Sequence, residues 1–328
     1  MPSAEPVQDT PVALSEARPD APSAPRSRAT ARRSRGRGRG RGRGWVAFLF
    51  VAPALLVYAV FVLRPLVYTV WYSLYHWDGI GASTWVGLDN YREVFSDPEL
   101  LGTIGHAFEL IIFFSLIPVV LGLAIASVIR RIATSRLAYA GRTVLFLPQV
   151  IPLVAAGIAW SWMLSDSGFV NQVFSWVGLD SITRAWLGDF STALPAVGVI
   201  GAWVLLGLVT LLLLAGMSKI DPVLYEAARM DGAGPLREFF HITLPSLRQE
   251  IGVCVTVTVI AALASFDIVY ISTQGGPGNA TMVPGLEIYY QAFSERQVGL
   301  ASALAVVLMV VVLACVLPLQ WLTRRGER

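Results

Sequence analysis

The chain is poor in charge, in lysine and in reactive side chains. Only 14% of its 328 residues are charged, whereas 55% are hydrophobic, and it has three histidines and two cysteines. This balance excludes an ordinary soluble domain and indicates a chain that resides in a bilayer. Cys254 and Cys315 both fall within apolar runs, so the sequence predicts neither a disulfide framework nor a metal site. The histidines show no ligand spacing.

The scarcity of lysine excludes one kind of nucleotide site. A phosphate-binding P-loop needs Gly-Lys-Ser or Gly-Lys-Thr, but the single lysine, Lys219, lies between Ser218 and Ile220. We therefore expect no ATP site and no bound cofactor on this chain. No constellation of catalytic groups is visible either, so we do not expect an enzyme.

Long runs without charge are abundant, and they set the fold class. Five of the six runs reach the length of about 18 residues that spans a bilayer. The run beginning at Ile251 is shorter because Asp267 interrupts it, although apolar character resumes through Ile271. The sequence predicts an all-α integral membrane protein with six transmembrane helices at Trp45–Leu63, Leu110–Ile129, Thr143–Ser165, Phe190–Ser218, Ile251–Phe266 and Gln297–Thr323.

Basic residues are concentrated on alternate connections. Ten arginines precede the first run, and eleven further basic residues lie in the segments 130–142, 219–248 and 324–328. The opposite connections carry only Arg92, Arg184 and Arg296. The positive-inside rule then places both termini and the segment 219–248 in the cytoplasm.

Residues 1–44 differ in composition from the remainder. They are rich in Pro, Ala, Ser and Arg and end in alternating Arg and Gly from Arg35 to Gly44. Such a segment is typical of a disordered tail. No aromatic residue is interleaved with the arginines, so we favour contact with anionic lipid over nucleic acid.

The connection after the fourth run contains a polar helical hairpin. Asp221 followed by Pro222 is a good helix start, because the carboxylate accepts from free backbone N–H groups and proline needs no donor there. Gly232 and Gly234 permit the turn that ends this helix. Pro235 can begin a second short helix that runs to about His241.

The first helix of this hairpin has two faces. Val223, Leu224, Ala227 and Ala228 fall on neighbouring turns as a small apolar face. The polar side chains Glu226, Arg229 and Asp231 remain for a partner or for water. From these residues alone, an ordinary cytoplasmic hairpin and a docking surface for another protein both stay open.

A spacing pattern in the hairpin resembles a known motif. Glu226-Ala227-Ala228, two residues, Asp231-Gly232-Ala233, and then Ile242-x-Leu244-Pro245 is similar to the motif by which permease subunits of binding-protein-dependent ABC importers seat on their ATPase. Two further stretches resemble the carbohydrate-importing branch, of the maltose and glycerol-3-phosphate type. They are Trp85–Tyr91 with Ser96-Asp97-Pro98, and Phe266–Tyr270 leading into Gly275–Thr281. One departure is Gln249, where many relatives carry proline.

The resemblance covers about residues 45 to 323 and implies an organisation. It implies the type I ABC importer permease fold over residues 45–328, with a core module at about 104–323 and a coupling hairpin at about 221–245. It also implies a multi-pass protein of the plasma or inner membrane that works with a second, homologous permease subunit. Two cytoplasmic ATPases, which use ATP and Mg²⁺, and an extracytoplasmic solute-binding protein complete the implied assembly. The residues of this chain implied to couple to the ATPase are Glu226, Ala227, Ala228, Asp231, Gly232, Ala233, Ile242, Leu244 and Pro245.

Asp267 is the most notable ionisable residue within the apolar runs. Charged groups at membrane depth are costly and are candidates for function. We expect Ser265, Phe266, Asp267 and Tyr270 to face a central cavity, where an aromatic ring stacks on a sugar and polar groups meet its hydroxyls. The alternative is that Asp267 lies near the outer edge and is hydrated. Weaker candidates for the pathway are Gln149, Trp160 and Trp162.

These observations favour a permease subunit of an ATP-driven ABC importer for a sugar, an oligosaccharide or a polyol derivative. An ABC permease for a non-sugar solute is the nearest alternative. A secondary transporter would need more ion-relay residues than Asp267 alone. An intramembrane enzyme would need paired catalytic groups that the sequence lacks.

Overall fold

The computed structural model describes residues 41–132 and 135–324. The chain divides into two compact units, Met1–Leu55 and Leu56–Arg328. Of the first unit, the described part is the beginning of helix α1, which starts at Arg41. The predicted disorder of residues 1–40 lies outside the described residues. Helix α1 begins at Arg41, four residues before the predicted boundary after residue 44.

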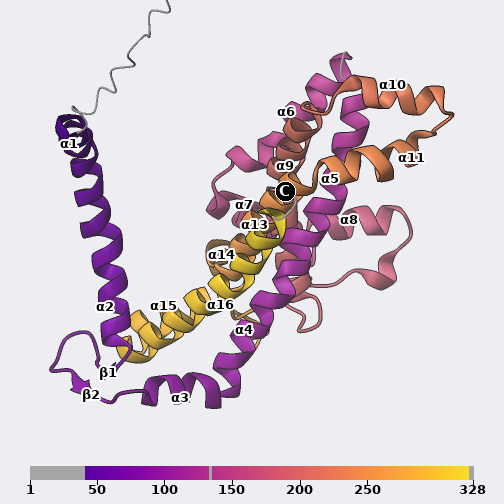
Figure 1. Ribbon diagram of the computed structural model, residues 1–328. Coiled ribbons are helices and arrows are strands. Elements are labelled where there is room, and N and C mark those ends of the chain that lie inside the picture. The colour runs from indigo at the N-terminus through magenta and orange to yellow at the C-terminus, as the bar shows by residue number, and fades with distance from the viewer. Residues whose placement is uncertain (1–40, 133–134, 325–328) are drawn as a thin grey trace, which may run out of the picture. The chain divides into compact units, whose positions relative to one another are not determined.

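The described residues are almost entirely helical (Figure 1). Two strands of two residues pair antiparallel, with Tyr75 opposite Trp85. The α-helices and strands are α1 Arg41–Tyr58, α2 Arg64–Tyr72, β1 Tyr75–His76, β2 Thr84–Trp85, α3 Asp89–Ser96, α4 Pro98–Ile111, α5 Ile117–Arg131, α6 Arg136–Val150, α7 Leu153–Met163, α8 Phe169–Trp176, α9 Ala193–Met217, α10 Pro222–Met230, α11 Pro235–Glu238, α12 Leu244–Ser246, α13 Arg248–Leu263, α14 Asp267–Ser272, α15 Pro284–Tyr289 and α16 Val298–Arg324.

Six segments are long and apolar enough to cross a membrane, if each of two bent helix pairs counts as one span. Four are single stretches, at Phe48–Tyr72, Pro98–Arg131, Ala193–Met217 and Val298–Thr323. The bent pairs are Arg136–Val150 with Leu153–Met163, at 100°, and Pro235–Ser246 with Arg248–Leu263, at 70°. The predicted all-α membrane fold is confirmed, and each of the six predicted runs overlaps one of these segments.

The fifth predicted span differs from expectation at its far end. Helix α13 ends at Leu263, and the apolar residues after Asp267 form the separate helix α14 instead of continuing α13. Phe266, with φ −142° and ψ −62°, lies outside the helical region and separates the two. Asp267 then lies in the first turn of α14, where the free N–H groups favour a carboxylate.

Three π-helical turns lie just before prolines. The turns Ala59–Leu63, Ile112–Leu116 and Phe239–Thr243 each end two residues before a proline, at Pro65, Pro118 and Pro245. Proline lacks an N–H and crowds the preceding turn, so a wider turn relieves that clash within a continuing helix. Pro65 and Pro118 therefore adjust their helices without ending them, whereas the helix that contains Pro245 ends at Ser246.

Helix α9 is the most buried of the four single apolar segments, and glycines allow other helices to approach it. A Cβ atom at Gly201 would overlap the ring of Phe114, and one at Gly207 would overlap the carbonyl oxygen of Leu145 in α6. The side chains of Ile200 and Leu213 are fully buried in the clusters on either side. The two glycines thus allow the backbone of α6 and the ring of Phe114, in the π turn before α5, to lie close against α9.

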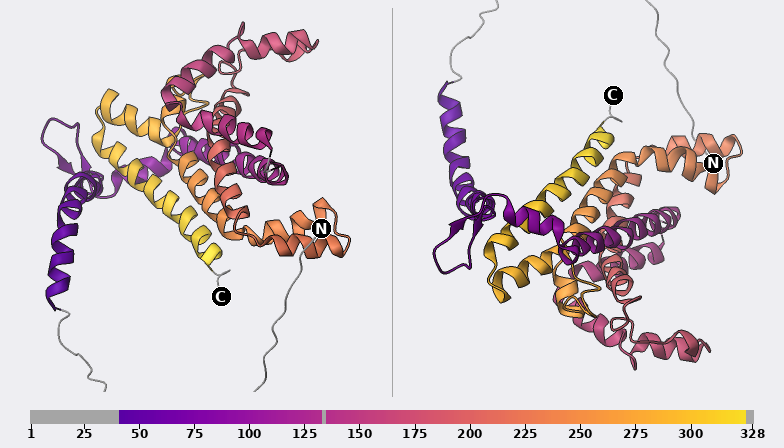
Figure 2. Two further views of the ribbon diagram at one scale, coloured as in Figure 1. Left: turned by 90° about the horizontal axis from the view of Figure 1, so that it is seen from above. Right: turned by 90° about the horizontal axis from the view of Figure 1, so that it is seen from below.

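The hairpin α10–α11 lies at one end of α5 and α9, and α3 lies at the far end of α4, the helix that precedes α5 (Figure 1). Both views of Figure 2 show the hairpin projecting from the neighbouring helices. The opposite end is joined by side chains, since the His106 ring is 2.8 Å from the carbonyl oxygen of Met282 and Asn279 donates to Glu99.

Candidate functional site

The hairpin begins and turns as its sequence predicts. The Asp221 carboxylate accepts from the backbone N–H of Val223 at 2.9 Å, and Pro222 occupies the first turn of α10. Gly232 has φ +76°, in the left-handed region, and turns the chain towards α11. The predicted capping chemistry is confirmed at both ends of α10.

The apolar face of α10 is uncovered within this chain. Val223 and Leu224 are 61% and 51% exposed, and Met230, at the end of the same helix, is 89% exposed. The predicted coupling residues Glu226, Ala227, Asp231, Gly232 and Pro245 are exposed, whereas Ala228, Ala233, Ile242 and Leu244 are half-buried. The exposed part of the motif thus forms a surface that another protein can reach.

Tyr225 anchors α10 to the second half of the hairpin, and the sequence analysis missed it. Its side chain is 3% exposed, and its hydroxyl lies 2.9 Å from the Thr243 hydroxyl. The guanidinium of Arg130, at the end of α5, lies 3.6 Å from the centre of the Tyr225 ring. A tyrosine flanked by exposed residues within the motif was the only local signal for this anchor.

Arg229 has a partner within the chain, which corrects the expectation that it is left for a partner or for water. Its Nε donates to the Glu238 carboxylate at 2.8 Å, and the Glu238 side chain is only 9% exposed. This hydrogen bond raises the pKa of the Arg229 guanidinium above its ordinary value. The turn at Gly232 brings α11 back along α10, so this hydrogen bond joins two residues that are nine positions apart in the sequence.

The second half of the hairpin is longer than predicted. Instead of ending near His241, the helix continues through a π turn to Ser246 and then bends by 70° into α13. Leu247, at the bend, is fully buried. The hairpin is thus joined to the fifth apolar segment through a packed residue.

The break between α13 and α14 borders a recess of about 210 Å³, here called the α13–α14 recess. Ser265, Phe266 and Asp267 line it, together with residues of α7 and α9. Asp267 is exposed and Ser265 is buried. These three predicted pathway residues are therefore brought together at one cavity.

Tyr270 does not line this recess but packs behind it. Its ring stacks on Phe266 with centroids 5.3 Å apart and an interplanar angle of 11°. Tyr289 of α15, which the sequence analysis did not identify, lies 5.6 Å from both rings. An aromatic cluster thus supports the position of Phe266.

The three weaker candidates for the solute pathway have different surroundings in the structure. Gln149 precedes the 100° break between α6 and α7, and its buried Oε1 has no hydrogen-bond partner in the part of the chain described. Trp160 packs in the core against Trp203. Trp162 is 74% exposed, which suits an interfacial position.

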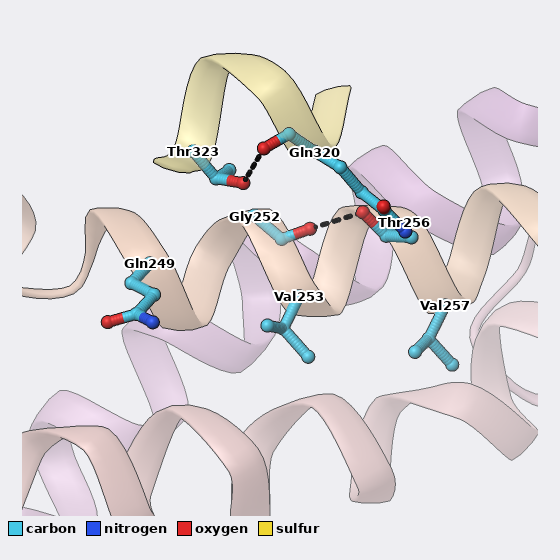
Figure 3. A pocket seen from close by; sticks show the side chains of 7 residues that line it. All are labelled: Gln249, Gly252, Val253, Thr256, Val257, Gln320 and Thr323. Carbon is cyan, nitrogen blue, oxygen red and sulfur yellow. Dashed lines mark hydrogen bonds between the residues drawn. The ribbon is translucent and has the colours of Figure 1, made fainter. Parts of the chain in front are cut away.

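Gln249 borders a second recess of about 290 Å³ between α13 and α16. Figure 3 shows Gly252 and Thr256 facing Gln320 and Thr323 on the other helix, with Gln249 on the same helix as Gly252. A Cβ atom at Gly252 would overlap the Thr323 side chain, so the helices approach closely here. The residue that departs from the family pattern therefore lies at a helix contact near the hairpin.

Metal-ligating residues are not clustered in residues 41–132 and 135–324, where no group of three His, Cys, Asp or Glu residues could hold an ion.

The chain is similar to transport proteins over most of its length. Residues 109–326 match the family described as binding-protein-dependent transport system inner membrane component. The probable ABC transporter permease protein YurN of Bacillus subtilis is 36% identical, over 82% of this chain and 92% of that protein. The diacetylchitobiose uptake system permease protein NgcF of Streptomyces coelicolor is 33% identical, over 85% of this chain and 83% of that protein.

A solved structure has the same fold. A chain of a bacterial ABC transporter involved in the import of the acidic polysaccharide alginate matches with a TM-score of 0.74 and 24% identity, over 86% of this chain and 96% of that chain. The chain therefore belongs to the family of binding-protein-dependent transport system inner membrane components, and it is a multi-pass permease subunit of an ABC importer that is not itself catalytic.

Proposed function

We propose that this permease subunit imports a carbohydrate and that the α10–α11 hairpin couples it to cytoplasmic ATPases. The proposed assembly contains a second permease chain, two ATPases and an extracytoplasmic solute-binding protein. Both termini and the hairpin lie on the cytoplasmic side. Two contacts support a common side for these segments, because Arg130 at the end of α5 lies over Tyr225 of the hairpin and Thr323 of α16 lies against Gly252 of α13. The basic residues of the segments 130–142 and 219–248 are typical of a cytoplasmic side.

One observation carries the coupling proposal: helix α10 exposes an apolar face while other side chains of the same helix hold it against the second half of the hairpin. Val223, Leu224 and Met230 are uncovered, while Tyr225 and Arg229 fix the same helix to Thr243 and Glu238. A partner that packs on such a face can move the hairpin as one piece. ATP-driven movement of the partner would then favour an outward-facing arrangement of the spans over an inward-facing one.

Charge reversal in the exposed motif tests the coupling. We expect Glu226→Lys to abolish ATP-dependent uptake or co-purification of the ATPase, because Glu226 is exposed beside the apolar face. Gly232→Pro should do the same, because proline fixes φ near −65° and Gly232 needs φ +76°. Glu295→Lys makes the same charge change at an exposed residue at the other end of the spans and serves as the control. Normal uptake by both hairpin variants would refute the proposed coupling.

The α13–α14 recess is the proposed solute contact. Phe266 offers a ring that can stack on a sugar face, and Ser265 and Asp267 offer groups for hydroxyls. The carbohydrate class is supported by the uptake system named for NgcF. Discontinuous helices at a recess suit this role, because helix breaks free backbone groups for a substrate.

Kinetics of uptake test the recess separately from assembly. We expect Phe266→Ala and Asp267→Ala to impair transport while the ATPase still co-purifies, because the recess is remote in sequence from the hairpin. Phe95→Ala truncates an aromatic ring of α3 that is 59% exposed and does not line the recess, and it provides the comparison. Unchanged kinetics in both recess variants would overturn the assignment, and binding measurements on the solute-binding protein would identify the solute class.

A further inference from the structure

A basic recess lies between the end of α5 and the hairpin. It encloses about 160 Å³ and contains Arg130, Arg131 and Arg229 with one carboxylate, that of Glu238. Glu238 is hydrogen bonded to Arg229. Within residues 41–132 and 135–324, Arg130 and Arg131 have no carboxylate partner, so the recess carries an uncompensated positive charge.

Arg130 is held in a position suited to an anion. Its guanidinium lies over the face of the buried Tyr225 ring. Stacking uses the face of the guanidinium and leaves its N–H edge available, which is the edge that binds phosphate bidentately. The chain therefore orients a phosphate-binding group without neutralising it.

An apolar groove continues from this recess. It encloses about 540 Å³ between α5 and the second half of the hairpin, and it shares Ser127, Arg131, Pro235 and Phe239 with the basic recess. Its remaining lining is apolar and comprises Val120, Leu123, Ala124, Val128, Leu236, Phe240 and Leu244. A ligand that fills both spaces is anionic at one end and apolar over the remainder.

The direction of the groove identifies the occupant. It extends along α5 from Arg131 to Val120, a distance of about 16 Å at 1.5 Å per residue. This part of α5 belongs to the apolar segment Pro98–Arg131. An acyl chain can enter such a groove from the bilayer, whereas a free phosphate ion gains nothing from the apolar lining.

We propose that the basic recess and the apolar groove together bind an anionic phospholipid, which rests on the proposed placement of the hairpin at the cytoplasmic face. Its phosphate contacts Arg130 and Arg131, and an acyl chain lies along Val120, Ala124 and Val128. Basic pockets beside transmembrane helices on the cytoplasmic side bind such headgroups. The lipid then contacts α5 and the hairpin at once.

Lipid retention by the assembled transporter tests this proposal. The complex is exchanged into phosphatidylcholine nanodiscs that contain phosphatidylglycerol, re-purified in detergent, and its retained lipids are quantified by mass spectrometry. Arg131→Gln should reduce retained phosphatidylglycerol roughly fivefold, as expected for one arginine near an anionic headgroup. Ala124→Trp should also reduce it, because it fills the groove without changing a charge.

Two controls match these variants. Arg136→Gln removes an exposed arginine on the same connection, and Leu121→Trp adds a ring on a face of α5 outside the groove. Both should retain the lipid. Equal retention in Arg131→Gln and Arg136→Gln would overturn the proposal.

Two other outcomes would also overturn it in favour of a different ligand. Competition by soluble glycerophosphate that is insensitive to Ala124→Trp would identify a free anion. Loss of ATPase co-purification in Arg131→Gln with phosphatidylglycerol unchanged would identify a protein contact. If the unaltered chain co-purifies no ATPase, the proposed function fails, and the lipid assignment is still decided by retention.

Discussion

At the scale of single residues, Tyr225 makes two contacts that hold the hairpin together. Its hydroxyl lies 2.9 Å from the Thr243 hydroxyl, and Arg130 covers its ring. A hydroxyl that is buried on folding gives up its hydrogen bonds to water. If it then loses its partner inside the protein, it is left without a hydrogen bond, which costs stability. The position of the exposed motif thus depends on a buried residue beside it.

Removal of the Tyr225 hydroxyl should loosen α10. Tyr225→Phe keeps the ring and its contact with Arg130 but loses a hydrogen bond worth about 1 kcal/mol. We expect amides of α10 to exchange hydrogen roughly fivefold faster in hydrogen–deuterium exchange, since 1.4 kcal/mol corresponds to a factor of about ten. Tyr139→Phe removes the hydroxyl of a tyrosine that is 77% exposed and should leave α10 unchanged. Identical exchange in both variants would contradict the anchoring role.

The contacts of some residues could be predicted from the sequence, and those of others could not. The Asp221 cap was predictable because its partner, the Val223 N–H, is two residues away. Tyr225 and Thr243 are 18 residues apart, and their contact depends on the length of a helix that the sequence underestimated. The helix cap could therefore be predicted from neighbouring residues, whereas the buried contact between Tyr225 and Thr243 could be identified only in the folded structure.

At the scale of elements, glycines determine how closely helices pack on α9. Gly207 allows α6 to approach so closely that its Cβ position falls on the Leu145 carbonyl oxygen. A backbone atom cannot rotate away, so a methyl group there must displace the helix. By contrast, Gly105 in α4 has no atom within 4 Å of its Cβ position.

Substitution of these two glycines should have opposite effects. Gly207→Ala should destabilise the protein by about 1–3 kcal/mol through overpacking, whereas Gly105→Ala should be neutral or stabilising because alanine favours helix by about 1 kcal/mol. Thermal unfolding in detergent, followed by fluorescence, measures both. Equal melting temperatures for the two variants would show that α6 can move away at little cost.

The six apolar segments were predictable as elements, and their breaks were only partly so. Run length identifies a span because hydrophobic thickness dictates it. Pro148 and Pro152 flank the 100° break, but the sequence also places Pro118 within a helix that continues. The π turn that absorbs Pro118 depends on neighbouring helices, so composition alone could not distinguish a bend from a break.

At the scale of the whole molecule, sidedness is testable with a membrane-impermeant maleimide. Glu295→Cys should be labelled in intact cells, and Met230→Cys only after permeabilisation, because the proposed orientation places these exposed residues on opposite sides. The native thiols interfere little, since Cys254 is buried and Cys315 half-buried. The protein without added cysteine is the control. Labelling of Met230→Cys in intact cells would reverse the orientation.

The 70° bend at the buried Leu247 and the helix break at Phe266 lie at the two ends of α13. The 16 residues of α13 make a rod about 24 Å long. If the hairpin is pulled and α13 tilts by about 10° around Leu247, simple trigonometry on that length moves the Phe266 end by roughly 4 Å. A swing of that size is comparable to the thickness of a sugar ring, so a small movement of the hairpin would change the width of the proposed solute contact at Phe266.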